Sequence, residues 1–369
     1  MDKSAWTYKR LDEVCDKGSS NIVINRLESH EGDYPLYGAS GIVKSIDFYH
    51  QEKPYIGIVK DGSGVGRVNT YPAYSSLVGT MQYILPKDGE QLKYIKYFLE
   101  KLDLSHLVTG AAIPHIYFKD YGKKKIPIPS KEIQRRIVGE LDAINESILL
   151  FQQQVEDLDL LAQSFFYDMF GDPTENPKHW QVMKVGDMAS EIKYGTSSPA
   201  CENGQYKYLR MCNLTYNGYL DLSDIKTINI SETEIEKYIV RRGDILFNRT
   251  NSLDLIGKTC MFDENEPMVI AGYIIRVRLK KEILPVYFAR AFNLPSIKSV
   301  LRKLAKGAVN QANINSKELA SISLPIPPLE LQKSFASKMI EIEASKSLLN
   351  AQITEMKSML SGRMQYWFD

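Results

Sequence analysis

Two long stretches of the sequence carry apolar residues in a heptad pattern. In the first stretch, alternating steps of four and three residues run without a break through Ile137, Leu141, Ile144, Ile148, Phe151, Val155, Leu158, Ala162, Phe165 and Met169. The corresponding apolar positions of the second stretch are Phe335, Met339, Ile342, Leu349, Ile353, Met356, Leu360 and Trp367. A repeat of this period over so many turns predicts two long helices that pair in a coiled coil. The alternative is an amphipathic helix on a globular core, but such helices are usually about 8–20 residues long and have a wider apolar face.

The two heptad stretches belong to an internal repeat with an offset of 198 residues. An Ile-Pro-Ile-Pro motif at 126–129 precedes the first stretch, and Leu-Pro-Ile-Pro at 324–327 precedes the second. A Glu-x-Gln sequence follows each motif, at 132–134 and at 330–332. Self-similarity of this kind predicts that the chain folds as two copies of one structural plan.

The repeat predicts four segments: a globular domain over 1–129, a spacer helix over 130–170, a linker and second globular domain over 171–327, and a second spacer helix over 328–369. From Ile137 to Met169 the first helix would extend about 50 Å, whereas the linker 171–177 reaches only about 25 Å. The second domain must then begin near the far end of the first helix. We therefore expect two antiparallel helices that join two globular domains in a pseudo-two-fold repeat. Lys346 and Arg363 occupy apolar positions of the second stripe, so either their stems lie along the seam or the pairing shifts there.

The globular segments show a mixture of strand and helix patterns. Residues 55–59 and 244–247 are short apolar runs, which predict buried strands. Residues 274–279 alternate in their second half, which predicts a half-exposed strand. Amphipathic helices are expected near 90–103 and 285–304. The fold class predicted for the two domains is therefore α+β, a mixed α/β arrangement.

Charge is unevenly distributed, although the net charge of the 369 residues is only +1. Residues 1–129 carry 17 basic and 15 acidic side chains and residues 171–327 carry 21 and 17, whereas residues 130–170 carry 3 and 8. The positive charge thus falls on the globular segments, although so small an excess does not establish nucleic-acid binding. No apolar run reaches the roughly 18 residues of a membrane span, and four scattered cysteines suit a reducing compartment. We expect a cytoplasmic protein without a membrane partner.

Motifs of catalytic and cofactor sites are missing from the sequence. Residues 61–67 contain three glycines, but their Gly-x-Gly-x-Gly spacing departs from the dinucleotide motif, and the strand-like stretch 68–71 follows. We interpret the run as a tight strand connection. Asp244 stands in a Gly-Asp sequence typical of a turn, and the acid-x-Lys triplets at 191–193 and 224–226 are common by chance. No methyltransferase motif and no metal-ligand spacing is present, so we expect no enzyme activity, metal or cofactor in this chain.

Several short motifs in a fixed order resemble the specificity (HsdS) subunits of type I restriction–modification systems over nearly the whole chain. In the first half they are Tyr-Gly-Ala-Ser-Gly at 37–41, the glycine run after a strand, and the stretch from Gly110 to the Ile-Pro motif. In the second half they are Asn-Pro-x-x-Trp at 176–180, Arg-Gly-Asp-Ile-Leu-Phe at 242–247 and Asn-Gln-x-Asn-Ile-Asn at 310–315. Each motif is weak alone, but their order, their duplication and the two heptad helices are specific together.

The resemblance implies two target-recognition domains that each read one half of a split double-stranded DNA target. It implies that the helices set the gap between the half-sites and bind two modification (methyltransferase) subunits, with restriction subunits completing the complex. The S-adenosylmethionine and ATP chemistry would belong to those partners. Two other functions stay open: a structural coiled-coil scaffold with no role on DNA, and part of a fused methyltransferase or nuclease.

DNA-contacting side chains are expected in the loops that follow strands and in the loops before the long helices. Asn and Gln can pair with adenine, and Arg with guanine or phosphate. The candidates in the first half are Lys60, Ser63, Arg67, Thr109 and His115, and those in the second are Asn248, Arg249, Thr250, Asn251, Asn310, Gln311 and Asn313. Any one of them could instead form a turn or cap a helix, and Arg249 is the strongest single candidate.

Overall fold

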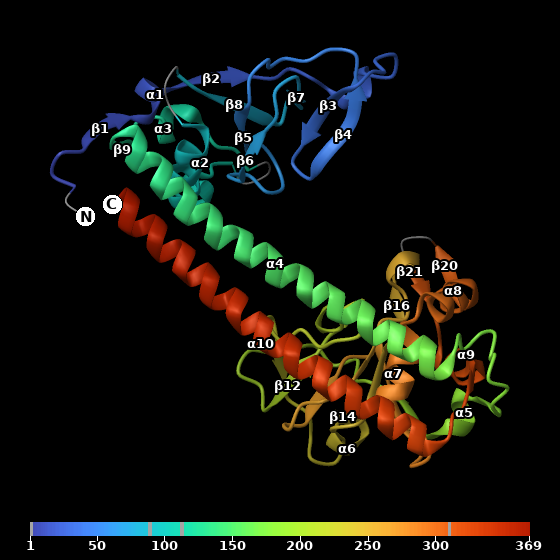
Figure 1. Cartoon of the computed structure of the whole chain (residues 1–369). Helices are drawn as coiled ribbons and strands as arrows, with labels where there is room; N and C mark the ends of the chain where they lie inside the picture. The colour runs from blue at the N-terminus through green and yellow to red at the C-terminus, as the bar shows by residue number, and fades with distance from the viewer. Residues whose placement is uncertain (1–2, 88–90, 111–113, 309–310) are drawn as a thin grey trace. The chain divides into compact units, whose positions relative to one another are not determined.

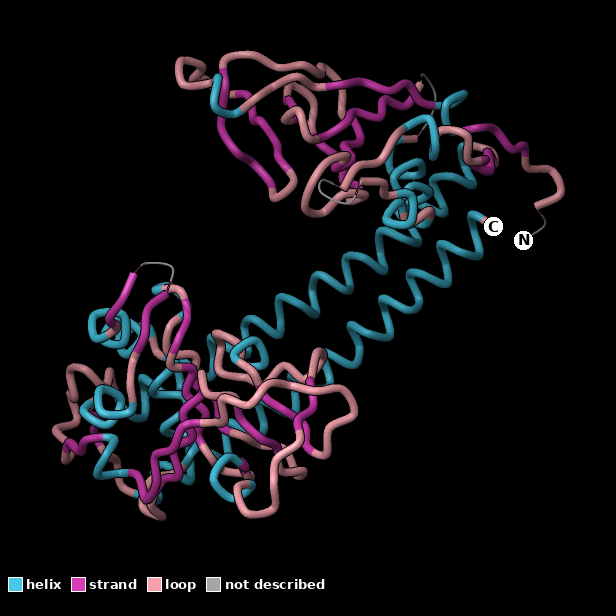
Figure 2. The backbone as a smooth tube through the Cα atoms, turned by 180° about the vertical axis from the view of Figure 1, so that it is seen from behind, coloured by secondary structure: helices cyan, strands magenta, loops and turns pink. Residues whose placement is uncertain are grey.

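The computed structural model describes residues 3–87, 91–110, 114–308 and 311–369, in two compact units. The first unit comprises Met1–Gln153 with Asn350–Asp369, and the second comprises Gln154–Leu349. Both units mix helices and strands (Figure 2), which confirms the predicted α+β fold class. The predicted division into four segments follows different boundaries from these units and stays a prediction.

The central sheet has the same strand order in both units. It runs β2–β8–β5–β6 in the first unit and β11–β19–β15–β17 in the second, with every neighbouring pair antiparallel. The bounds are β2 Cys15–Ser19, β5 Tyr55–Val59, β6 Val68–Tyr71, β8 Met81–Pro86, β11 Ala189–Tyr194, β15 Ile245–Asn248, β17 Thr259–Met261 and β19 Ile274–Leu279. The sequence repeat is therefore also a repeat of sheet topology, and the predicted buried strands are β5 and β15, all of whose residues are buried.

A second sheet accompanies the central one in each unit, and each contains one parallel pair. The pairs are β3 with β7 and β12 with β18. The strands of these sheets are β3 Tyr34–Gly38, β4 Gly41–Ile46, β7 Ser76–Leu77, β12 Tyr206–Leu209, β13 Lys226–Ile228, β14 Ile239–Val240 and β18 Met268–Ile270. Two-stranded ribbons contain the Pro-rich motifs: β1 Thr7–Arg10 with β9 Lys125–Ile128, and β10 Val182–Lys184 with β22 Ser323–Pro325. Each ribbon thus ends where a long helix begins.

Short helices cover the sheets. They are α1 Leu11–Val14, α2 Leu92–Lys101, α3 Phe118–Tyr121, α5 Val185–Met188, α6 Ile235–Tyr238, α7 Pro285–Asn293, α8 Pro295–Leu304 and α9 Ser316–Ser321, with 3-10 turns at Ile24–Arg26, Leu104–Leu107, Met211–Asn213 and Leu253–Leu255. The single helix expected near 285–304 is wrong, because α7 and α8 are separate. Leu294 between them is extended (φ −68°, ψ 145°), the conformation that a residue before proline favours.

The two heptad stretches form the long helices α4 (Lys131–Phe170) and α10 (Leu329–Phe368), which lie side by side (Figure 1). Each has 40 residues, which corresponds to about 60 Å of helix. Ser130 caps α4, since its Oγ accepts a hydrogen bond from the Ile133 N–H (3.4 Å). In the second unit, Asp159 and then Phe166 of α4 contact Lys346 and then Phe335 of α10, so the helices are antiparallel there.

The eighteen apolar residues of the two predicted heptad stripes are all buried or half-buried. At the ends of the helices they also join the cores of the globular parts. Ile137 and Leu141 pack in one cluster with Trp6 and Trp367 of the first unit, and Phe335 and its neighbours pack in the main cluster of the second. In the last turns of α4, Phe166 (1% exposed) and Phe170 (2%) are buried more deeply than the predicted Phe165 and Met169. The sequence pattern thus locates the apolar stripe of the helix, but it does not predict that the buried face shifts by one residue in these last turns.

The strand predicted at 274–279 is confirmed as β19, but the prediction that it is half-exposed is wrong. The first four residues of β19 are buried, and the Arg276 side chain has no exposed surface. Its guanidinium donates hydrogen bonds to the Glu191 carboxylate and to the Ile239 carbonyl, so the cation is buried together with an anion and a backbone acceptor. The neighbouring Arg278 forms an ion pair with Asp244 (3.0 Å). Asp244 therefore has an ion pair in addition to the turn position predicted for it.

Candidate nucleic-acid interface

In the second unit, most of the candidate DNA-contacting residues meet where the buried strand β15 ends. Arg249 follows this strand, and its main chain is fixed on both sides. Its N–H donates to the Tyr273 carbonyl (3.0 Å), and its carbonyl accepts from the Ile314 N–H (2.9 Å). The first of these bonds joins the end of the strand to the residue that precedes β19, and the second joins it to the segment that precedes the last short helix of the unit. The Cα of residue 249 is therefore held by main-chain contacts alone.

The Arg249 side chain lies between an amide and an aromatic ring. Its Nη2 donates to Asn313 Oδ1 (3.2 Å), and its guanidinium carbon lies 4.9 Å from the centre of the Tyr194 ring. Asn313 also donates to the Thr250 hydroxyl (3.0 Å). A guanidinium has five N–H donors in a fixed plane, so this arrangement orients the group and leaves donors for a ligand. The sequence analysis missed Tyr194, whose distance of 55 residues from Arg249 hides the contact.

The remaining candidates of the second unit differ in accessibility. Thr250 and Asn251 form β16 (Thr250–Asn251), which pairs with β21 (Gln311–Asn313), and β21 pairs in turn with β20 (Lys306–Ala308). Gln311 is exposed and Asn251 half-exposed. Asn248 has no exposed surface, and its Oδ1 accepts from the Thr250 N–H (3.1 Å), so it shapes the loop and is no longer a contact candidate. Asn310 lies outside the described residues.

The first unit repeats the same main-chain geometry at Lys60. This residue follows β5, its N–H donates to the Thr80 carbonyl (3.0 Å), and its carbonyl accepts from the Ile116 N–H (3.0 Å). Ile116 and Ile314 are 198 residues apart, which is the offset of the sequence repeat. Lys60 and Arg249 are therefore equivalent positions of the two halves, and each carries a cation.

The side chains around Lys60 form a charged cluster. The Asp61 carboxylate accepts one hydrogen bond from Lys60 Nζ (2.5 Å) and a second contact from His115 Nδ1. Burial alone would raise the pKa of the Asp61 carboxyl, but the bonds from Lys60 and His115 hold that pKa below its usual value. Thr109 and His115 exchange main-chain hydrogen bonds of 2.8 Å each. The cluster thus brings together three of the five residues selected from the sequence and adds Asp61.

The other two candidates, Ser63 and Arg67, are exposed on the glycine-rich connection between β5 and β6. Gly64 has a left-handed backbone (φ 82°), and a Cβ there would lie 1.8 Å from the Arg67 guanidinium. The glycine therefore makes room for Arg67, which donates a weak bond to the Ala39 carbonyl (3.4 Å). The predicted role of this run as a tight strand connection is confirmed.

A buried lysine supports the loop that carries Arg249. Lys298 of α8 is 3% exposed, and its Nζ donates to the Gly257 carbonyl (2.7 Å). The Gly257 N–H in turn donates to the Asn248 carbonyl (3.2 Å), at the base of the loop that carries Arg249. Burial lowers the pKa of Lys298 to about 7. This lysine acts on the loop through the main chain, because it does not touch the candidate side chains.

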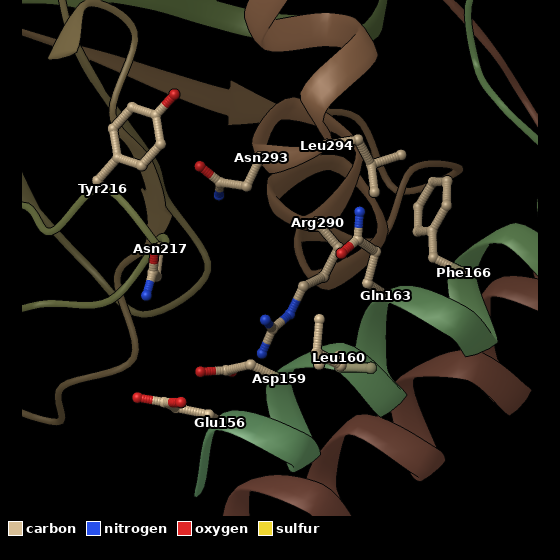
Figure 3. A pocket seen from close by; sticks show the side chains of 11 residues that line it. Glu156, Asp159, Leu160, Gln163, Phe166, Tyr216, Asn217, Arg290, Asn293 and Leu294 are labelled. Carbon is tan, nitrogen blue, oxygen red and sulfur yellow. The ribbon is translucent and has the colours of Figure 1, made fainter. Parts of the chain in front are cut away.

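The second unit also has a cavity of about 370 Å³ between α4, α7 and the loop at 216–217 (Figure 3). An ion cluster lies beside it: Lys346 Nζ donates to Asp159 (2.6 Å) and to the Tyr219 hydroxyl (2.7 Å), and Arg290 donates to the same hydroxyl (2.9 Å) and to Glu343. Burial raises the pKa of the Tyr219 hydroxyl. The charges of this cluster are paired with one another, so the cluster fastens the globular part of the second unit to α4 and α10.

Ion pairs with α4 account for both charged residues on the apolar stripe of α10. Lys346 is 7% exposed and is paired with Asp159, so its charge does not reach water. Arg363 bonds to Glu140 of α4 (2.9 Å for the Nη2 bond), and its guanidinium carbon lies 5.1 Å from the Trp367 ring. Both charges are therefore neutralised by α4, and neither requires the pairing of the helices to shift.

In the part of the chain that the structure describes, no helix is long and apolar enough to span a bilayer. Within the same residues, no group of three or more His, Cys, Asp or Glu side chains is arranged as a metal site.

Comparison with known proteins gives one consistent result. The family model described as "Type I restriction modification DNA specificity domain" matches residues 3–158 and 177–357. The chain is 24% identical over 275 residues to the type I restriction enzyme EcoKI specificity subunit of Escherichia coli K12, which covers 70% of this chain but only 59% of that protein, less than two thirds. It is 26% identical over 373 residues to the MjaVIII specificity subunit of Methanocaldococcus jannaschii, covering 92% and 86% of the two chains.

Solved structures show the same fold. The crystal structure of the S subunit of a type I restriction–modification system from M. genitalium matches with a TM-score of 0.55 at 15% identity, over 99% of this chain and 96% of that one. A chain from a second type I system, solved to explain its complex assembly, matches with a TM-score of 0.55 at 17% identity, over 99% and 98%.

Proposed function

Because this chain belongs to the family of type I restriction–modification DNA specificity proteins, we propose that it selects a bipartite DNA target for a modification and restriction complex. In this proposal each globular part reads one half-site of the duplex. The methyl transfer and the DNA cleavage are carried out by partner subunits, together with the S-adenosylmethionine and ATP that they use.

The observation that carries the proposal is the duplication of one polar site. Lys60 and Arg249 each follow the buried strand of a matching sheet. The main-chain carbonyl of each accepts a hydrogen bond from an isoleucine, and the residue before that isoleucine is polar: His115 in the first half and Asn313 in the second. Two similar sites with different side chains suit two short DNA sequences that are not copies of each other. A scaffold without a role on DNA has no need for a cation at the equivalent position of both halves.

The long helices offer surfaces for the partners. Large apolar side chains that are 42–69% exposed gather on them, and such surfaces commonly mark protein interfaces. They are Leu149, Leu150 and Met359 in the first unit, and Leu160, Leu161, Ile340 and Leu348 in the second. We propose that two modification (methyltransferase) subunits bind there and that restriction subunits join the assembly.

We expect the complex of this chain with its modification subunits to methylate two short motifs separated by a fixed number of unspecified base pairs. The physical reason is that two different polar sites, each on its own globular part, read different bases. Sequencing of methylated bases in DNA exposed to the purified complex gives the pattern directly. A single continuous methylated motif contradicts the bipartite target, and methylation by this chain alone favours the fused-enzyme alternative.

Arg249→Ala should weaken binding to target DNA by about 1–3 kcal/mol, or roughly 5- to 150-fold. The reason is the loss of a guanidinium that Tyr194 and Asn313 hold in place. Arg249→Lys keeps the charge but not the planar fork, so a comparable loss for Lys shows that the fork itself is needed, and a loss of discrimination between target and single-base-substituted duplexes indicates contact with a base. Fluorescence anisotropy with target and single-base-substituted duplexes measures both effects.

The matched control is Arg242→Ala. This arginine is in the same unit, is 64% exposed and pairs with Asp263 at the surface. We expect target affinity to change less than about twofold, as for exposed charges away from an interface. Equal effects of the two substitutions would assign the loss to net charge and remove Arg249 from the recognition site.

A further inference from the structure

We propose that Asp61 is a specificity-determining residue of the first half, whose carboxylate occupies the donors of Lys60 and His115 and so limits their binding to phosphates of non-target DNA. This rests on the proposed function, because it concerns how the first half binds DNA. It adds an acidic group to an interface for which only neutral and cationic contacts were expected.

The geometry shows that Asp61 engages both neighbours at once. One carboxylate oxygen accepts from Lys60 Nζ (2.5 Å), and the other faces His115 Nδ1. The three side chains are 22–26% exposed, so the cluster is partly shielded from water. A partly buried ion pair is screened less by salt than one at the open surface. The carboxylate therefore competes with any approaching phosphate for these two donors, even in the presence of salt.

The equivalent site of the second half has no such acid. Thr250 follows Arg249, whereas Asp61 follows Lys60. Asn313 occupies the position that His115 has in the first half. Arg249 is therefore held by an amide oxygen and a tyrosine ring rather than by a carboxylate. In the first half the charges of Lys60 and Asp61 cancel each other. The two halves thus share a main-chain geometry but differ by one unit of charge at the same position.

This difference has a predictable effect on DNA binding. Non-specific binding comes mainly from cations that replace counterions on phosphates, and each such contact steepens the slope of log K against log salt by about 0.9. A Lys60 side chain that is paired with Asp61 contributes little to this non-specific binding. A base edge that donates to the Asp61 carboxylate, such as the cytosine amino group, can still be read. The first half would then bind through recognition of bases more than through charge.

A purely structural role for Asp61 makes the opposite prediction. The Asp61 N–H already bonds to the Thr80 carbonyl (3.2 Å), and the main chains of Asp61 and His115 form a bridge. If the carboxylate serves only to fix this loop, its removal should loosen the site and weaken binding to every DNA. If it restrains the cations, its removal should strengthen binding to non-target DNA.

The test uses the full chain in complex with its modification subunits and a labelled duplex that lacks the target. For Asp61→Asn we expect affinity for this duplex at 0.1 M salt to rise about tenfold, with a salt slope steeper by about one unit, as for one added phosphate contact. The ratio of target to non-target affinity should fall correspondingly. The second variant, Asp61→Asn with Lys60→Gln, removes the freed cation as well and should return the slope to its original value.

Asp16→Asn is the matched control, since this carboxylate is in the same unit, is 69% exposed and lies 3.6 Å from Lys87. An equal rise for Asp16→Asn, or an unchanged or lower affinity for Asp61→Asn, overturns the proposal. Loss of folding in Asp61→Asn, seen as a lower melting temperature together with weaker binding, also overturns it in favour of the structural role. If the unmodified complex does not prefer target DNA at all, the proposed function itself fails, which separates the two outcomes.

Discussion

Deletion of one heptad from each long helix should shorten the unspecified gap of the DNA target by about three base pairs. Seven residues contribute about 10 Å of helix at ~1.5 Å per residue, and DNA rises ~3.4 Å per base pair. Removal of matching heptads preserves the apolar stripe on both helices, so they can still pair. Methylation by the shortened complex should therefore disappear at the original site and appear at one with the same half-sites and a smaller gap.

The segments 151–157 and 349–355 suit this deletion, because they contain none of the exposed apolar residues of the proposed partner surface. They lie between the attachment points that the structure shows: Asn145 bonds to Tyr97 of the first unit (2.9 Å), and Asp159 bonds to Lys346 in the second. Deletion of 349–355 alone is the control, because it puts the stripes out of step and should impair assembly. Methylome sequencing that finds the doubly shortened protein active at the original spacing shows that the partners, not the helices, set the gap.

Phe166→Ala should cost about 3–5 kcal/mol of the stability of the second unit, the usual range for a fully buried phenylalanine. Phe166 is 1% exposed and packs between Tyr287 (5.5 Å between ring centres) and Phe335 (5.6 Å). The loss would leave a cavity between α4, α10 and α7, where these three helices meet. Such a change should also lower the amount of folded complex.

The adjacent Phe165 provides the matched control. It is half-buried, with Lys338 Nζ 4.6 Å from its ring centre, so we expect Phe165→Ala to cost about 1 kcal/mol or less. Denaturant unfolding followed by Trp180 fluorescence reports on this unit, since that ring lies 5.9 Å from Phe170. Trp6 and Trp367 would be replaced by Phe for the measurement. A larger loss for Phe165 than for Phe166 would restore the original heptad assignment of these turns.

The features that the sequence could predict are those set by local pattern. The heptads specify helices at 131–170 and 329–368 because their periodicity extends over many turns, and the apolar run 55–59 specifies β5 because both faces of that strand are buried. The 198-residue offset predicts the matching sheets for the same reason: similar local patterns form similar elements.

The features that it could not predict depend on partners far along the chain. Arg276 was expected at a polar, exposed position, but Glu191 reaches it from the neighbouring strand and allows its burial. Tyr194 lies against Arg249, and Tyr219 joins Lys346 to Asp159, through contacts that no spacing reveals. The candidates at the strand ends were found by residue type and loop position, whereas the acid Asp61 was overlooked because it was not an expected DNA ligand.

The main-chain fixation of Lys60 and Arg249 bears on how specificity can diversify. The bonds from the Ile116 and Ile314 N–H groups hold these positions whatever side chain stands there. Under the proposed function, substitutions at 60, 115, 249 and 313 would thus alter the bases that are read without disturbing the strand ends that present them. New DNA targets would then be acquired by a few point changes, while the main-chain scaffold stays the same.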